Sequence, residues 1–194
     1  MGSSSSESGG KAVTLDFGLS SAQLSADAKK AWPYDFALIY RVTLSKDGLQ
    51  TMLNVQNKGN EPFEFQMLLH TYFKIEDISK TTINGLGSTS YIDKVLNATE
   101  QQQTSPTISI TGEVDRVYKS IKQDTTSILH DGKSRFDVQR DNLEDTVTWN
   151  PWIEKAKAMG DFSPDDGYKQ MVCVEVGAVN GWQRLEYVPF PACP

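Results

Sequence analysis

Apolar and polar residues alternate at a period of two through much of the chain, a pattern that predicts short β-strands. The clearest case is residues 63–70, FEFQMLLH. One face would carry Phe63, Phe65, Met67 and Leu69, and the other Glu64, Gln66, Leu68 and His70. We therefore expect a half-buried strand with His70 at its end, on the mixed face.

Further strands are expected at 12–18, 36–45, 49–56, 107–110, 114–121, 127–129, 135–139, 146–149 and 171–176. Asp47-Gly48 and Asp131-Gly132 predict tight hairpin turns. Residues 97–106 are polar and indicate a loop. Helix is expected only as short turns, within 20–30 and at 153–159. Many short strands with turn signals roughly 8–12 residues apart favour an all-β sandwich or barrel.

The totals exclude several classes of protein. The chain has 194 residues, enough for one domain with a sizeable core, and its net charge of −6 argues against a nucleic-acid surface. We find no apolar run near the roughly 18 residues of a membrane helix and no secretory signal. Two cysteines, Cys173 and Cys193, are too few for a disulfide framework, so a cytoplasmic, reduced setting is expected.

The stretch 171–176, MVCVEV, is the second candidate for chemistry. Its valines share one face, and Glu175 shares the other with Cys173. Glu175 could be an edge-strand residue facing water, or a general base with a pKa raised by partial burial. His70 could likewise be a satisfied structural histidine. Together the two form an acid–base pair suited to proton transfer on a substrate.

Other chemistries have less support. There is no nucleophile-elbow sequence, no glycine-rich phosphate loop, and no histidine–cysteine spacing typical of zinc. His130, beside a tight turn, is expected to be a solvated turn residue. Trp149 and Trp152 could line a sugar site, although buried core aromatics are more common.

Several motifs together resemble one family. They are LLHTYFKIEDI (68–78), Gly85-Leu86 with Tyr91-Ile92-Asp93, EVDRVY (113–118), DTVTWNPWIEKAKAMGDF (145–162) and MVCVEVG (171–177). This combination is similar to the hexose-6-phosphate mutarotases, or glucose-6-phosphate 1-epimerases, of the aldose 1-epimerase superfamily. The resemblance runs from about residue 15 to about residue 186.

The resemblance implies a galactose-mutarotase-like β-sandwich with the sugar bound on one sheet. It implies that His70 is the general acid, that Glu175 is the general base and that Asp115 contacts sugar hydroxyls. The substrate would be a hexose 6-phosphate, and neither metal nor cofactor would be needed.

The chain also departs from the family pattern, and we expect it to be an incomplete sandwich, shortened at both ends. The family's upstream arginine motifs for the substrate phosphate do not occur. We expect a flexible Ser/Gly-rich leader at 1–10, the partial sandwich at 11–186 and a Pro-rich tail at 187–194. Activity on hexose 6-phosphates would then be weak. The alternatives are a non-catalytic carbohydrate-binding sandwich or an inactive fragment, either monomeric or dimeric through exposed sheet edges.

Overall fold

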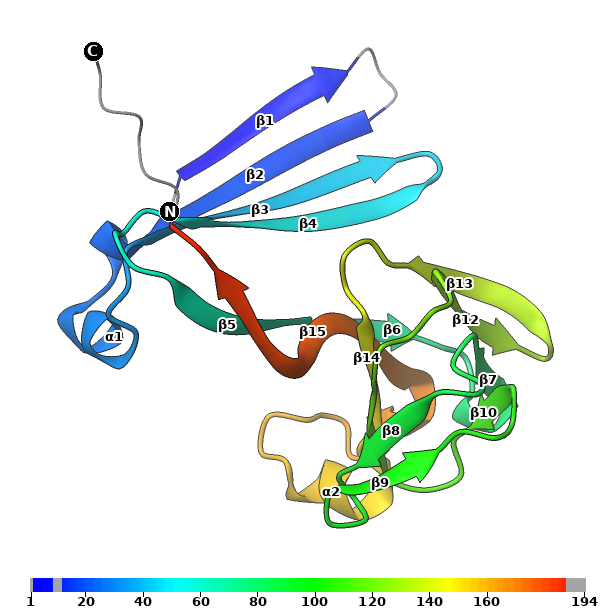
Figure 1. The fold of residues 1–194 in the computed structure, drawn as a ribbon. Helices are drawn as coiled ribbons and strands as arrows, with labels where there is room; N and C mark the ends of the chain where they lie inside the picture. The colour runs from blue at the N-terminus through cyan, green and yellow to red at the C-terminus, as the bar shows by residue number, and fades with distance from the viewer. Residues whose placement is uncertain (1, 9–11, 188–194) are drawn as a thin grey trace, which may run out of the picture. The chain divides into compact units, whose positions relative to one another are not determined.

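The structure, a computed structural model, describes residues 2–8 and 12–187. The chain divides into two compact units (Figure 1). Unit 1 comprises residues 1–65 and 183–194, and unit 2 comprises residues 66–182. The expected Pro-rich tail, with Cys193, lies outside the described residues except for Tyr187. Among the described residues, no helix is both long and apolar enough to cross a bilayer.

Unit 1 is built on a four-stranded antiparallel sheet. Its strands, in the order β1-β2-β3-β4, are Gly2–Ser8, Ala12–Ser20, Phe36–Ser45 and Gly48–Asn57. The tight turn predicted at Asp47-Gly48 is confirmed, since Ser45 pairs with Gly48 across it. A 3₁₀ turn at Ser21–Gln23 and helix α1 at Ala26–Ala31 precede β3, and the Ser25 hydroxyl caps α1 by accepting from the Ala28 amide.

Most of the stretch expected as a flexible leader, residues 1–10, forms strand β1, Gly2–Ser8. Its residues pair with β2 in register, from Gly2 opposite Gly18 to Ser8 opposite Ala12. Backbone amides and carbonyls make this ladder, so a serine-rich composition does not prevent it. Residues 1 and 9–11 lie outside the described part.

Unit 2 contains two sheets. The larger has seven strands in the order β5-β15-β14-β11-β8-β9, with β6 also paired to β15. These strands are β5 Phe63–Leu69, β6 Tyr72–Lys74, β8 Ser90–Asp93, β9 Thr99–Gln102, β11 Val114–Tyr118, β14 Asp145–Asn150 and β15 Met171–Leu185. The ends of β5 and β15 cross the boundary between the units.

The smaller sheet of unit 2 has four strands in the order β10-β7-β12-β13. They are β7 Thr81–Asn84, β10 Thr107–Ser109, β12 Thr125–His130 and β13 Lys133–Gln139. The hairpin predicted at Asp131-Gly132 joins β12 to β13. Short helices complete the unit: α2 at Trp152–Ala158 and 3₁₀ turns at Ile78–Lys80 and Gly167–Gln170.

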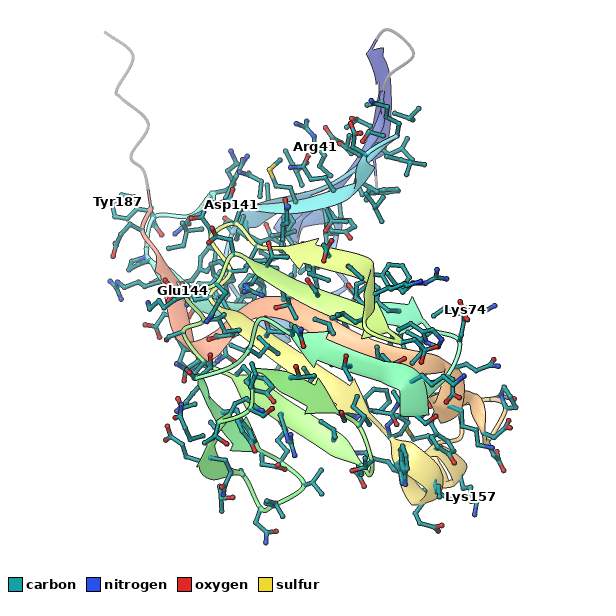
Figure 2. The ribbon with its side chains drawn as sticks, turned by 90° about the vertical axis from the view of Figure 1, so that its right-hand side faces the viewer. Arg41, Lys74, Asp141, Glu144, Lys157 and Tyr187 are labelled. Carbon is teal, nitrogen blue, oxygen red and sulfur yellow. The ribbon has the colours of Figure 1, made fainter. Side chains whose placement is uncertain are left out.

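The main core of unit 2 lies between its two sheets. Ile83, Ile108 and Ile128 come from the smaller sheet and are almost completely buried. They share one hydrophobic cluster with residues of the larger sheet, among them Tyr118 and Val172. Charged side chains such as Lys74 and Lys157 lie on the outside (Figure 2). The predicted all-β sandwich with a few short helices is therefore confirmed.

One expected loop is a strand. Residues 97–106 were predicted to be irregular because they are polar, but Thr99–Gln102 forms β9. This strand lies at the edge of the larger sheet, is exposed along its whole length, and within the described part of the chain pairs with β8 alone. An edge strand with no buried face carries no alternating pattern, so the hydrophobic signal could not reveal it.

Candidate functional site

Strand register brings four side chains into one row on the larger sheet. Cys173 pairs with Tyr72 on one side and with Trp149 on the other. Trp149 in turn pairs with Asp115. Residues directly opposite one another point to the same face, so the row crosses four strands on one face of the sheet. Val172 and Val174 point the other way, into the main core.

Glu175 lies two residues beyond Cys173 and therefore on the same face. His70 directly follows β5, and its Nδ1 is 3.4 Å from Glu175 Oε1. The imidazole is 51% exposed, whereas the glutamate side chain is 2% exposed. The interpretation of Glu175 as an edge residue facing water is therefore wrong. The structure brings the two predicted acid–base residues together, with the imidazole on the solvent side.

Gly177 makes this meeting possible. A Cβ added at Gly177 would lie 2.5 Å from the Met67 carbonyl oxygen and 2.7 Å from Leu68 Cδ1. Real Cβ atoms essentially never approach backbone so closely. The glycine therefore lets β5, which leads to His70, lie against β15, which carries Glu175.

Burial controls the charge of Glu175. The pKa of the carboxyl is raised to about 7, chiefly by burial and then by the nearby Asp115 carboxylate, while Lys94 acts to lower it. Glu175 Oε1 has no hydrogen-bond partner among the described residues. A carboxylate with a pKa near neutrality and an oxygen that makes no hydrogen bond is well suited to accept a proton.

Asp115, the predicted sugar-binding residue, lies on β11 on the face that carries Glu175. Lys94, which the sequence analysis did not single out, lies beside it, with Nζ 3.5 Å from Asp115 Oδ1. A lone lysine after a strand usually indicates only a solvated turn. The available signal was its place directly after the quoted run Tyr91-Ile92-Asp93.

Aromatic rings surround the imidazole. The Tyr72 ring stacks on His70 at a centroid distance of 4.9 Å, and Trp149 meets His70 edge to face at 6.1 Å. Burial raises the pKa of Tyr72, and Cys173 and Glu175 raise it further. Trp152 instead packs on Tyr168 against the main core. Of the two tryptophans considered for a sugar site, only Trp149 lies beside the acid–base pair.

The same residues offer metal-ligand atoms. Within the described ranges, His70, Cys173 and Glu175 are the group whose ligand atoms lie close enough together, all within 4.8 Å. A cysteine binds metal as the thiolate, but burial and the nearby Glu175 raise the pKa of Cys173, which keeps the thiol protonated. The arrangement therefore suits proton transfer better than metal binding.

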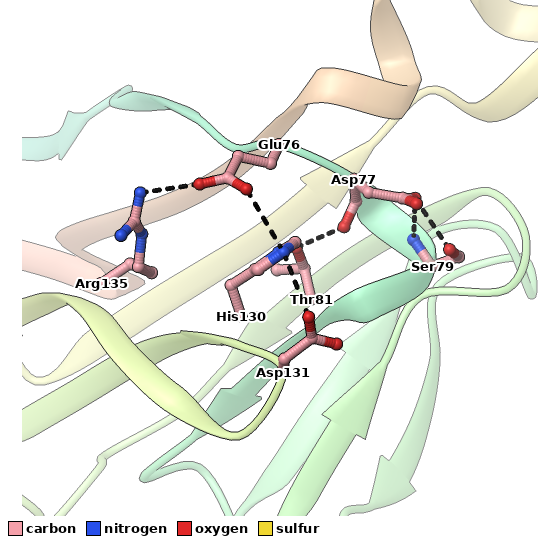
Figure 3. Close-up of polar contacts among 7 residues, drawn as sticks. All are labelled: Glu76, Asp77, Ser79, Thr81, His130, Asp131 and Arg135. Atoms are coloured by element: carbon pink, nitrogen blue, oxygen red, sulfur yellow. Dashed lines mark hydrogen bonds and ion pairs between the residues drawn. The ribbon is translucent and has the colours of Figure 1, made fainter.

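The second histidine is at a separate place (Figure 3). His130 ends β12 in the smaller sheet, and its Nε2 lies 3.5 Å from Glu76 Oε2 and 3.6 Å from Asp131 Oδ2. Its side chain is only 16% exposed, so the expectation of a solvated turn residue is wrong. The ring at the end of β12 is largely buried, whereas Asp131 in the following turn is 63% exposed.

The arginines of unit 2 are engaged in other contacts. Arg116 Nε bonds Asp93, Arg135 bonds Glu76, and Arg140 bonds Thr126, Thr146 and the Gln123 carbonyl. The cation next to Asp115 and Glu175 is a lysine.

Comparison with known proteins gives a consistent result. The sequence model of the aldose 1-epimerase family matches residues 10–186. A protein of Cenchrus ciliaris with the provisional name glucose-6-phosphate 1-epimerase is 37% identical over 153 residues, which cover 77% of this chain and 46% of that protein. A protein of Escherichia coli K12 with the same provisional name is 34% identical and aligns with 89% of this chain and 55% of itself.

Among solved structures, the crystal structure of YeaD from Salmonella typhimurium, provisionally described as a mutarotase, superposes with a TM-score of 0.82. It is 32% identical and covers 94% of this chain, and the alignment spans 58% of YeaD. The chain thus spans about half the length of the relatives it matches.

Proposed function

The chain belongs to the aldose 1-epimerase family, and on that premise we propose that it interconverts the α and β anomers of a hexose 6-phosphate. The observation that carries the proposal is the contact between His70 and Glu175 on one face of the larger sheet, with a Glu175 pKa near neutrality. The names of the plant and bacterial relatives support the sugar phosphate as substrate.

The proposed reaction opens and recloses the sugar ring. The Glu175 carboxylate takes the proton of the C1 hydroxyl while His70 gives a proton to the ring oxygen. The bond between C1 and the ring oxygen breaks, its electron pair stays on that oxygen, and C1 becomes a carbonyl carbon. After rotation about the C1–C2 bond, the same steps run in reverse and close the ring as the other anomer.

The geometry suits these steps because both reacting oxygens are bonded to the same carbon. An acid and a base that lie side by side, 3.4 Å apart, can reach both oxygens when the sugar takes the place of their mutual contact. The exposed imidazole is the part of the pair that can turn aside to admit the sugar. Asp115 would accept a hydrogen bond from another sugar hydroxyl.

The phosphate receives less support from this chain. Each arginine of unit 2 contacts other protein groups, and arginine is the residue best shaped to clamp a phosphate. We therefore propose that the chain by itself gains little from the phosphate and turns over hexose 6-phosphates weakly.

Anomer exchange measured by NMR tests the proposal. We expect the purified chain to speed exchange of glucose 6-phosphate above the spontaneous rate. His70→Ala and Glu175→Gln should each reduce that gain by roughly 10²–10⁴-fold, the usual contribution of a positioned acid or base. His130→Ala, which changes the histidine of the smaller sheet, is the matched control and should keep the rate.

The carbohydrate-binding alternative predicts a different result. Sugar binding without exchange, unaffected by His70→Ala and Glu175→Gln, would support a non-catalytic module and overturn the mutarotase proposal.

A further inference from the structure

We propose that Lys94 is a positioning residue of this site, whose ammonium holds the Asp115 carboxylate ready for a sugar hydroxyl and offsets its charge beside Glu175. This inference deepens the proposed function and rests on it.

Two contacts attach Lys94 to Asp115. The Lys94 amide donates to the Asp115 carbonyl oxygen at 2.8 Å, and the ammonium lies 3.5 Å from Asp115 Oδ1. The carboxylate side chain is 18% exposed, and among the described residues its other oxygen makes no hydrogen bond or ion pair. The lysine thus fixes one oxygen of Asp115 and leaves the second for a ligand.

The turn that carries Lys94 is itself held in place. Asp93 is buried, and its Oδ1 accepts from the amides of Val95 and Leu96 at 3.1 and 3.2 Å. Its Oδ2 accepts from Arg116 Nε at 3.1 Å, and the Arg116 guanidinium lies 4.9 Å from the Tyr91 ring centre. A turn anchored at both carboxylate oxygens presents Lys94 in a defined place rather than as a free surface charge.

The charges around Glu175 explain why a cation is needed. The ionisable side chains that face it are His70, Tyr72, Cys173, Asp115 and Lys94. Asp115 is the anion among them that acts directly on Glu175, and its repulsion favours the protonated form of a base. Lys94 acts in the opposite direction and keeps the carboxylate available.

Removing the lysine should be tolerated by the fold, since ion pairs that face solvent contribute little to stability. The test compares the full chain with Lys94→Met and Lys94→Arg. Lys155→Met is the matched control, because Lys155, which lies on α2, forms a similar ion pair with Glu113, with Nζ 3.1 Å from Oε1.

We expect Lys94→Met to raise the KM for the sugar and to move the acid-side midpoint of the pH–kcat profile upward. Below the midpoint, a rise of one pKa unit lowers the carboxylate fraction, and so kcat, about tenfold. At pH values well above the midpoint, the kcat of Lys94→Met should return to the wild-type value, while its KM stays above that of the wild type. Lys94→Arg should restore both, and Lys155→Met should change neither.

A carboxyl-carbon NMR titration of Glu175 in the same proteins separates the two proposals. If the titration midpoint rises in Lys94→Met but no variant exchanges anomers, Lys94 still offsets the charge of Asp115 beside Glu175, and the proposed function falls. If exchange is observed but Lys94→Met shifts neither midpoint nor KM, or Lys155→Met gives equal changes, the positioning role is overturned.

Discussion

Glu175 combines two properties that rarely occur together, since its ionisable side chain is only 2% exposed and one of its oxygens has no hydrogen-bond partner among the described residues. Burial of a charged carboxylate is costly unless the group is paired or protonated. The pKa of about 7 reflects that cost. A residue with only a structural role would be more stable as an amide or an apolar side chain, so the cost points to function.

This cost predicts how Glu175→Gln changes stability with pH. The folded pKa of Glu175, about 7, lies above its ordinary value of 4.5. The folded state therefore holds the proton more tightly, and the associated stability is present below about pH 4.5 and is lost as pH rises through about 7. Glu175→Gln has no carboxyl group to ionise at this position, so it does not lose this stability as pH rises.

Relative to the wild type, the free energy of unfolding of Glu175→Gln should therefore increase by about 3 kcal/mol between about pH 4.5 and about pH 8. Urea unfolding at several pH values measures the difference. Glu144→Gln serves as the control on an exposed carboxylate. A difference between Glu175→Gln and wild type that stays constant with pH would contradict the account.

At the residue scale, the sequence identified the pair but not its setting. His70 and Glu175 were predicted from a strand end and an alternating strand, and the structure brings them together. Lys94 was missed because its importance depends on Asp115, a residue on another strand. The burial of His130 was also missed, because a turn signal does not say how the preceding side chain packs.

Among the elements, β15 organises the site. It pairs with β14, β5 and β6, and both of its faces are buried from Met171 to Ala178. Its alternation correctly predicted which side chains share a face. The sequence ended the strand at residue 176, whereas β15 continues to Leu185. The extension is largely exposed, so it carries no hydrophobic signal.

Gly177→Ala tests the close approach of β5 to β15. The added methyl group would collide with the Met67 carbonyl oxygen and must push β5 away. We expect a loss of about 1–3 kcal/mol in the free energy of unfolding, as is usual for overpacking. Anomer exchange should fall further than stability explains, because His70 moves with β5.

Gly112→Ala is the matched control, since an added Cβ there meets nothing within 4 Å. Equal stability and equal exchange rates in the two alanine variants would show that Gly177 does not set the spacing of the pair.

For the whole molecule, the number of short strands and the hairpin turns were enough to predict an all-β sandwich. They were not enough to predict the order β5-β15-β14-β11-β8-β9, because these pairings join segments far apart in the sequence. The single domain expected at 11–186 and the expected monomer or edge-paired dimer stay predictions.

In unit 1, β2 and its neighbours expose a set of apolar side chains between 39% and 65%: Val13, Leu15, Phe17, Leu44 and Leu49. Alternation along β2 and the pairing of Val13 with Leu44 and of Leu44 with Leu49 put them on one face. A contiguous apolar face of this kind is uncommon on a soluble monomer. The chain spans about half of its relatives, and the activity proposed for it depends only on residues of unit 2.

The pH dependence of anomer exchange is the most direct test of the central claim, that Glu175 beside His70 acts as the base. With glucose 6-phosphate and with the spontaneous rate subtracted at each pH, the account predicts that the exchange rate rises through a one-proton midpoint at about pH 7, where the carboxylate forms. A rate that is flat from about pH 5 to about pH 8, or a midpoint that persists in Glu175→Gln, would contradict it.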